Sequence, residues 1–311
     1  GHTVAGNDNM IGGYTDNVPQ GVEFHQVDCC NLENMTKAME GCDIVYHTAA
    51  TAYEGLSVFS PVLVTRNIFE ASVTTITAAI RNKVKRIVYC SSMARYGHHD
   101  KLPYKEDYEC RPQDPYGIAK KAGEDVLRNL CETHGVEYVI AVPHNIVGPR
   151  QKYDDPFRNV MSIMLNRMLQ GKQPIIYGDG EQKRCFSYID DCLYCLNALA
   201  FHDNVVGEVI NIGPDEEPVT INELAEACAN ETGINLDPIH HKDRPKEVKL
   251  ATCSSDKARE LLGYKTSTNM RQSVSKTAEY IRTRGTKKFQ YHLPLEIVND
   301  ITPETWKNKL I

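Results

Sequence analysis

Short apolar stretches alternate with stretches of helical spacing along the first half of the chain. The apolar runs predict strands at 2–8, 21–28, 42–50, 85–92 and 136–149. Apolar residues three and four positions apart predict helices at 31–41, 60–82 and 116–135. Strands that alternate with helices favour a parallel sheet covered by helices on both faces. We therefore predict an α/β protein with a doubly wound parallel sheet.

The pattern changes after Pro149, where a polar, proline-containing loop begins. Beyond it, helical spacing predicts helices at 159–171, 220–233 and 256–264. Short apolar runs predict strands at 174–184, 185–191 and 207–213. Thr220 and Glu223 have the spacing of a capping box, and Gly263 has the position of a helix stop. The second half therefore predicts a smaller α/β lobe whose chain returns to the first.

Two serines follow the apolar run at 85–90, and Tyr116 and Lys120 stand four residues apart at the start of the next predicted helix. Chemistry in parallel sheets collects at the carboxyl ends of the strands. A tyrosine has a pKa of about 10, and a lysine one helical turn later lowers it by favouring phenolate. Ser92 can hold a substrate oxygen by a hydrogen bond. Together the three side chains predict a site that interconverts an alcohol and a carbonyl, although Tyr and Lys at this spacing alone are common on surface helices.

The composition of the chain limits the classes of binding partner that we expect. The net charge of −6 does not favour nucleic acid, and no apolar run approaches the roughly 20 residues that a membrane span needs. The 11 cysteines have no framework spacing, which favours reduced thiols in a cytoplasm. Cys192 and Cys195 form a single C-x-x-C without a second ligand pair, so we predict no metal site and two buried helical thiols.

Seven motifs occur in a fixed order along nearly the whole chain. They are GNDN, HTAA, CSSMARYG, YGIAK, PHNIVGPR, YGDGEQKRCFSYIDD and DRPKEV. In this order they resemble the extended short-chain dehydrogenase/reductases, specifically the NAD-dependent nucleotide-sugar epimerase/dehydratase family of the UDP-glucose 4-epimerase type. The resemblance implies a Rossmann-like dinucleotide-binding domain (1–148 plus 186–212), a nucleotide-sugar substrate lobe (149–185 plus 213–265) and a C-terminal helix and tail (266–311).

The resemblance also assigns residue roles. It implies catalysis by Ser92, Tyr116 and Lys120. It implies NAD binding by Asp8, Asn9, Asp28, Cys29, Ala49, Ala50, Tyr116 and Lys120, with Asp8 selecting NAD over NADP. It implies binding of a UDP-sugar by Ser92, Asn145, Arg184, Arg244, Glu247 and Ala251. It further implies a homodimer formed through a four-helix bundle from helices near 69–82 and 116–131.

Two features depart from the family pattern. The family opens with a strand, a Gly-rich turn and a helix that hold the cofactor pyrophosphate, whereas residue 1 corresponds to the end of that helix. We expect either a sequence that begins downstream of its true start or a shortened relative that has lost its cofactor, and the retained Asp8, Tyr116 and Lys120 favour the first. A missing central strand is expected to leave a gap in the sheet and to expose apolar surface. The second departure is Arg95, where the family has an apolar residue.

The loop after Ser92 selects among the reactions of the family. Met93 and Ala94 supply neither the acids of the 4,6-dehydratases nor the cysteine of the 3,5-epimerases, and the Glu of the decarboxylases is missing too. This elimination favours epimerisation at C4 of a UDP-sugar through a transient 4-keto intermediate. Another nucleotide-sugar redox enzyme, a reductase or dehydratase, and a Rossmann scaffold without cofactor stay open as alternatives. The small Ala251 at the sugar gate predicts that 2-acetamido sugars are accepted.

Overall fold

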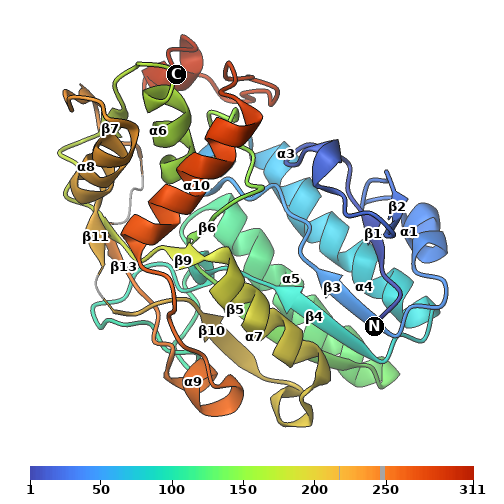
Figure 1. Cartoon of the computed structure of the whole chain (residues 1–311). Helices are drawn as coiled ribbons and strands as arrows, with labels where there is room; N and C mark the ends of the chain where they lie inside the picture. Colours follow the sequence, from blue (N-terminus) through green and yellow to red (C-terminus); the bar gives the residue numbers. More distant parts are fainter. Residues whose placement is uncertain (217, 246–248) are drawn as a thin grey trace.

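A four-stranded parallel sheet forms the centre of the molecule in the computed structural model, which describes residues 1–216, 218–245 and 249–311 (Figure 1). The strand order is β10–β5–β4–β3. The strands are β3 (Ile44–His47), β4 (Arg86–Cys90), β5 (Glu137–Pro143) and β10 (Val209–Ile212). Each strand pair is parallel, with Ile87 opposite Tyr138 between β4 and β5. The prediction of a doubly wound, Rossmann-like parallel sheet is confirmed.

Side chains of β4 alternate between the two faces of the sheet, as a period of two requires. Ile87 and Tyr89 join the core formed with α4 (Ala71–Arg81) and α5 (Pro115–His134). Val88 and Cys90 join the opposite core, formed with α7 (Ile189–Phe201). Figure 1 shows α7 on one face of the sheet and α4 with α5 on the other. Because both faces of β4 are buried, its sequence reads as a continuous apolar run.

The sheet is split on its β3 side. β1 (Ala5–Asn7) and β2 (Glu23–His25) pair with each other in a separate two-stranded sheet, next to α1 (Leu32–Ala38). Among the described residues, β4 is the only strand partner of β3. Tyr46 on β3 is 41% exposed, and Val4, directly before β1, is 50% exposed. The expectation of a gap left by a missing strand stays a prediction.

Several predicted elements differ from the observed ones; the strands predicted at 136–149 and 174–184, for example, are each observed as two shorter strands. The helix predicted at 60–82 is α3 (Pro61–Thr65), a π-helical stretch (Arg66–Glu70) and then α4. The strand predicted at 185–191 shortens to β9 (Ser187–Tyr188), because α7 begins at Ile189. Asp190 and Asp191 lie in the first turn of α7, where acidic side chains stabilise a helix through its dipole.

A second core lies between α6 (Val160–Met168), α8 (Ile221–Thr232) and α10 (Met270–Arg284). Short strands surround it: β6 (Ile146–Val147), β7 (Ile175–Tyr177), β8 (Lys183–Arg184), β11 (Val219–Thr220), β12 (Ile239–His241) and β13 (Leu250–Ala251). The capping box at the start of α8 is confirmed, since the Glu223 amide donates to Thr220 Oγ1 at 3.0 Å and the Thr220 amide donates to Glu223 Oε2 at 2.7 Å. The helix α9 (Asp256–Leu262) ends at a left-handed Gly263 and packs against β10. The division into a dinucleotide-binding domain and a substrate lobe stays a prediction.

Arg86, at the start of β4, is 1% exposed and ties the sheet to α7. Its Nη1 donates to the carbonyls of Leu199, Ala200 and His202, at 3.2, 3.0 and 2.7 Å. Its Nε donates to the carboxylate of Glu137 at 2.8 Å. One buried guanidinium therefore satisfies the last carbonyls of α7 and joins them to two strands.

Candidate active site

The sequence at the start of α5 fixes the positions of Tyr116 and Lys120. Asp114 caps the helix by accepting a hydrogen bond from the Gly117 amide at 2.8 Å, and Pro115 occupies the first helical position. Tyr116 and Lys120 follow on one face, with exposures of 9% and 2%. The predicted pair therefore lies on the buried side of α5, against the end of β4, and is no surface pair.

Ser92 lies two residues after the end of β4 and contacts Tyr116. Its hydroxyl accepts a hydrogen bond from the Ala94 amide at 3.2 Å and begins a short 3-10 turn (Met93–Arg95). Burial raises the pKa of Tyr116 to about 12, and the hydrogen bond with Ser92 acts against that shift. The structure thus brings two of the three predicted catalytic side chains into contact.

Lys120 contacts the same strand end. Its Nζ donates to the Cys90 carbonyl at 2.8 Å and lies 5.6 Å from the centre of the Tyr89 ring. Burial lowers the pKa of Lys120 to about 8, while Cys90 and Glu124 raise it. The sequence predicted that Lys120 lowers the pKa of Tyr116. In the structure burial has the largest effect on that pKa and raises it, and the positive charge that lowers it belongs to Arg158.

The residues predicted to hold NAD lie at three places along the sheet. Asp8 follows β1, and Asp28 and Cys29 follow β2, beside the split. Asp8 Oδ1 accepts from the Met10 amide at 2.6 Å, and Asn9 Oδ1 from the Ile11 amide at 3.2 Å. Ala49 and Ala50 follow β3 and are half-buried. The carboxylates of Asp8 and Asp28 can accept hydrogen bonds from one ribose of a dinucleotide. Tyr116 and Lys120, at the other end, can donate to the second ribose. The residues present therefore fit a dinucleotide.

The residues predicted to bind substrate gather around β8. Arg184 on β8 lies opposite Ala251 on β13, which is 7% exposed. Asn145, with a positive φ of 45°, donates to the Cys185 carbonyl at 3.0 Å. The guanidinium of Arg244 lies 5.0 Å from the centre of the Tyr177 ring. The position predicted for the uridine ribose, Glu247, lies outside the described residues.

Sequence reasoning missed two charged residues that act on Tyr116. Glu54 raises the pKa of Tyr116 and Arg158 lowers it. Glu54 opens the short helix α2 (Glu54–Ser57), which comes after the HTAA motif. Arg158 lies in the loop before α6, where its Nη2 donates to the Gly12 carbonyl at 3.2 Å. Both residues lie in segments that follow strand ends, Glu54 at the first position of α2 and Arg158 in a loop, and that position is the signal that could have found them.

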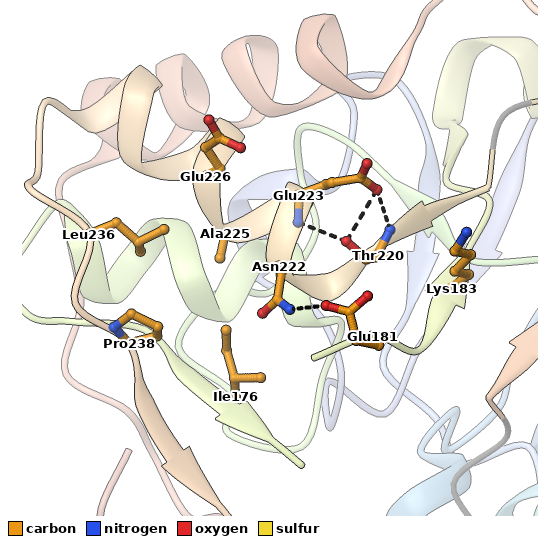
Figure 2. Close-up of a pocket in the computed structure, with 10 residues that line it drawn as sticks. All are labelled: Ile176, Glu181, Lys183, Thr220, Asn222, Glu223, Ala225, Glu226, Leu236 and Pro238. Carbon is orange, nitrogen blue, oxygen red and sulfur yellow. Dashed lines mark hydrogen bonds between the residues drawn. The ribbon is translucent and has the colours of Figure 1, made fainter. Parts of the chain in front are cut away.

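A separate hollow of about 610 Å³ is lined by residues of β7, β8, β11 and α8 (Figure 2). Its polar groups form hydrogen bonds with one another. Asn222 donates to Glu181 at 2.7 Å, and the Thr220 amide donates to Glu223. It shares no residue with the predicted site. Over the described ranges, no three His, Cys, Asp or Glu side chains are grouped to hold a metal ion. In the same ranges no helix has the length and apolar character that crossing a membrane requires.

A doubly wound sheet with Ser, Tyr and Lys gathered at a strand end is an arrangement that can interconvert an alcohol and a carbonyl with the help of a hydride-carrying cofactor. Residues 1–213 match the model of the "NAD dependent epimerase/dehydratase family". The chain therefore belongs to the NAD-dependent epimerase/dehydratase family, whose members act on nucleotide sugars, and its cofactor is NAD.

Individual relatives agree with this assignment. The chain is 30% identical over 281 residues to a GDP-mannose 3,5-epimerase of Arabidopsis thaliana, covering 86% of this chain and 72% of that protein. The UDP-glucose 4-epimerase of Thermotoga maritima, solved with UDP-glucose, has a TM-score of 0.86 at 28% identity over 91% of this chain and 92% of that one. The UDP-glucose 4-epimerase of Thermus thermophilus, solved with NAD, has a TM-score of 0.83 at 26% identity over 90% and 91%.

Proposed function

We propose that this protein is a UDP-sugar 4-epimerase. The observation that carries the proposal is the contact of Ser92 with Tyr116 on the helix that bears Lys120, beside a turn whose residues Met93 and Ala94 supply no further acid or base. Such a set can move one proton at one sugar oxygen. That is enough for epimerisation, whereas dehydration and epimerisation at C3 and C5 need additional proton-transfer groups.

The proposed mechanism assigns each side chain one task. Ser92 holds the C4 oxygen of the sugar, and Tyr116 takes its proton and later returns it. Lys120 contributes a positive charge that favours the phenolate of Tyr116 once the site is closed. Asp8 at one end and Tyr116 with Lys120 at the other would hold NAD, which would supply the hydride acceptor and donor that the reaction at C4 needs. Arg184 and Arg244 hold the diphosphate by charge-assisted hydrogen bonds, so the keto-sugar can turn without leaving.

The direct test is interconversion of UDP-glucose and UDP-galactose by the purified protein with NAD present. Epimerisation is redox-neutral, so we expect product without net change in NADH absorbance. Stoichiometric NADH consumption would support the alternative of a reductase. Loss of water from the sugar would support a dehydratase, and the absence of any turnover with tight nucleotide binding would support a scaffold.

The sugar pocket gives a prediction about specificity. Ala251→Tyr is expected to lower turnover of UDP-N-acetylglucosamine at least tenfold relative to UDP-glucose, because a bulky ring fills the space beside the 2-acetamido group. Leu250→Tyr, at the neighbouring 38% exposed position, is the matched control. Both ratios are measured on protein whose melting temperature shows that it is folded, since Ala251 is buried. An unchanged ratio in Ala251→Tyr would place the gate elsewhere.

The face of α5 opposite the site gives a prediction about assembly. Ile118 is 54% exposed, and Ala122 next to it is half-buried. We propose that this face, with α4, forms the four-helix seam of a homodimer. Ile118→Arg is expected to shift the mass from dimer to monomer in light scattering at micromolar protein. Leu193→Arg, which changes an equally exposed apolar residue on α7, is expected to leave the mass unchanged. A monomeric unmodified protein would reject the seam.

Two further parts of the proposal concern the cofactor type and the location. Asp8 is expected to favour NAD because its carboxylate accepts from a free 2′-hydroxyl and repels a 2′-phosphate. The 11 cysteines, all free in the structure, support a reducing, cytoplasmic location.

A further inference from the structure

Arg95, the unexpected arginine after Ser92, is buried in an ion pair. Its side chain is 4% exposed, and its Nη2 lies 2.9 Å from Oε2 of Glu124, which is fully buried on α5. Its guanidinium also lies 5.1 Å from the centre of the Tyr96 ring. Taking two charges out of water is costly, and removing one partner leaves the other uncompensated. Loss of either Arg95 or Glu124 is therefore expected to destabilise the position of the other side chain.

The carboxylate of Glu124 makes a second contact with the end of β4. Its Oε1 accepts a hydrogen bond from the hydroxyl of Ser91, the residue before Ser92. One turn earlier on α5, Lys120 donates to the Cys90 carbonyl. Cys90, Ser91 and Arg95 are thus all held by α5. Ser92 lies inside this span, and the same helix carries Tyr116.

The packing between α5 and the segment 89–95 leaves little room for adjustment. A Cβ at Gly117 would lie 2.7 Å from the Ala94 carbonyl oxygen, and a Cβ at Gly123 would lie 2.2 Å from the hydroxyl of Tyr89. A larger residue at position 117 would push the backbone of Ala94 away, and one at position 123 would displace the ring of Tyr89. The helix therefore packs against the backbone of the segment on one side of Lys120 and against a buried tyrosine on the other.

We propose that the buried Arg95–Glu124 pair is a positioning element that fixes Ser92 against Tyr116, although neither of its residues is placed to touch substrate or cofactor. Without Arg95, the Glu124 carboxylate is left in a buried site without a counter-charge and takes up a proton on Oε2. Its Oε1 still accepts from Ser91, but the side chain of residue 95 no longer contacts α5 through an ion pair. The turn that carries Ser92 therefore loses its link to α5 on the side that follows Ser92.

The catalytic readout rests on the proposed epimerase activity and uses four variants. Arg95→Met is expected to lower kcat at least tenfold while KM for the UDP-sugar changes less than about twofold, because substrate contacts are intact and the Ser92 geometry is not. Arg95→Lys is expected to recover part of kcat. Glu124→Gln together with Arg95→Met is expected to give a higher kcat than Arg95→Met alone, because Gln is neutral without taking up a proton and its side-chain oxygen still accepts from Ser91. The matched control is Arg271→Met, which changes an exposed arginine of α10.

A second readout needs no activity. The amides of Ala94, Arg95 and Tyr96 are hydrogen-bonded within the turn, to Ser92 Oγ, the Ser92 carbonyl and the Met93 carbonyl. Hydrogen exchange in peptides spanning 91–97 is expected to quicken at least tenfold in Arg95→Met and to stay unchanged in Arg271→Met. Unchanged exchange, or a folded Arg95→Met protein with the kcat of the unmodified enzyme, would overturn the positioning role. Absence of epimerase activity in the unmodified protein would instead reject the proposed function, and the exchange experiment would still decide the role of the pair.

Discussion

Tyr116→Phe is expected to lower epimerase turnover by roughly 10²–10⁴-fold, the usual effect of removing a positioned proton-transfer group. The ring of Phe fills the same buried space, so packing against Ala94 and Ala119 is preserved. Only the hydroxyl that meets Ser92 is lost. Because the proposed phosphate contacts come from Arg184 and Arg244, affinity for the UDP-sugar should stay within a few-fold. Turnover by a coupled assay and affinity by calorimetry separate the two effects.

The control for this variant is a tyrosine far from the site. Tyr194, 57% exposed on α7, donates its hydroxyl to the Leu262 carbonyl. Tyr194→Phe therefore removes a hydroxyl without touching the proposed chemistry and should turn over normally. Undiminished turnover in Tyr116→Phe would reject Tyr116 as the acid and base.

Lys120→Met is expected to act in opposite directions on activity and on stability. Turnover should fall at least a hundredfold, because the charge that favours the phenolate is removed. The free energy of unfolding at pH 7 should rise by about 1–2 kcal/mol. Burial lowers the pKa of Lys120 from 10.5 to about 8, a shift that corresponds to about 3 kcal/mol of destabilisation while the group is charged. The lost hydrogen bond to the Cys90 carbonyl offsets part of the gain.

The sign of the pH dependence follows from the same shift. Between about pH 8 and 10.5 the unfolded chain holds a proton on Lys120 that the folded protein has lost, so stability contributed by this group increases with pH across that window. The stability gap between Lys120→Met and the unmodified protein should be largest below pH 8 and should narrow toward pH 10. Urea unfolding at pH 7 and pH 9.5 measures it. A gap that does not narrow would mean that Lys120 is not a buried charge.

Elements with a strong local pattern could be predicted from the sequence, and those shaped by distant contacts could not. β4 was evident because residues on both of its faces are apolar, and α8 because Thr220 and Glu223 mark its start. The π-helical stretch between α3 and α4 has no such signal. There Asn67 is buried and donates to Thr51 Oγ1 at 2.9 Å, and Arg66 lies 3.6 Å from Asp28. Both partners are remote in sequence.

The site shows the same division. Ser92, Tyr116 and Lys120 were found because their spacing along a strand, loop and helix is itself the signal. Glu54 and Arg158 influence the pKa of Tyr116 from two segments about a hundred residues apart, which no local pattern records. Arg95 could be noticed in the sequence as an anomaly. Its partner Glu124 could be identified only once the register between α5 and the end of β4 was known.

The buried Arg86 has a consequence for how the protein unfolds. Its three carbonyl partners at the end of α7 are 113 to 116 residues away in the chain, so these contacts close a very long loop and are expected to form late in folding. Once formed, they resist partial opening. Detaching α7 alone would leave Nη1 of Arg86 and the carbonyls of Leu199 and Ala200 without these partners. The four strands and α7 should therefore open as one cooperative unit, and the amides of β4 should exchange only through that global opening.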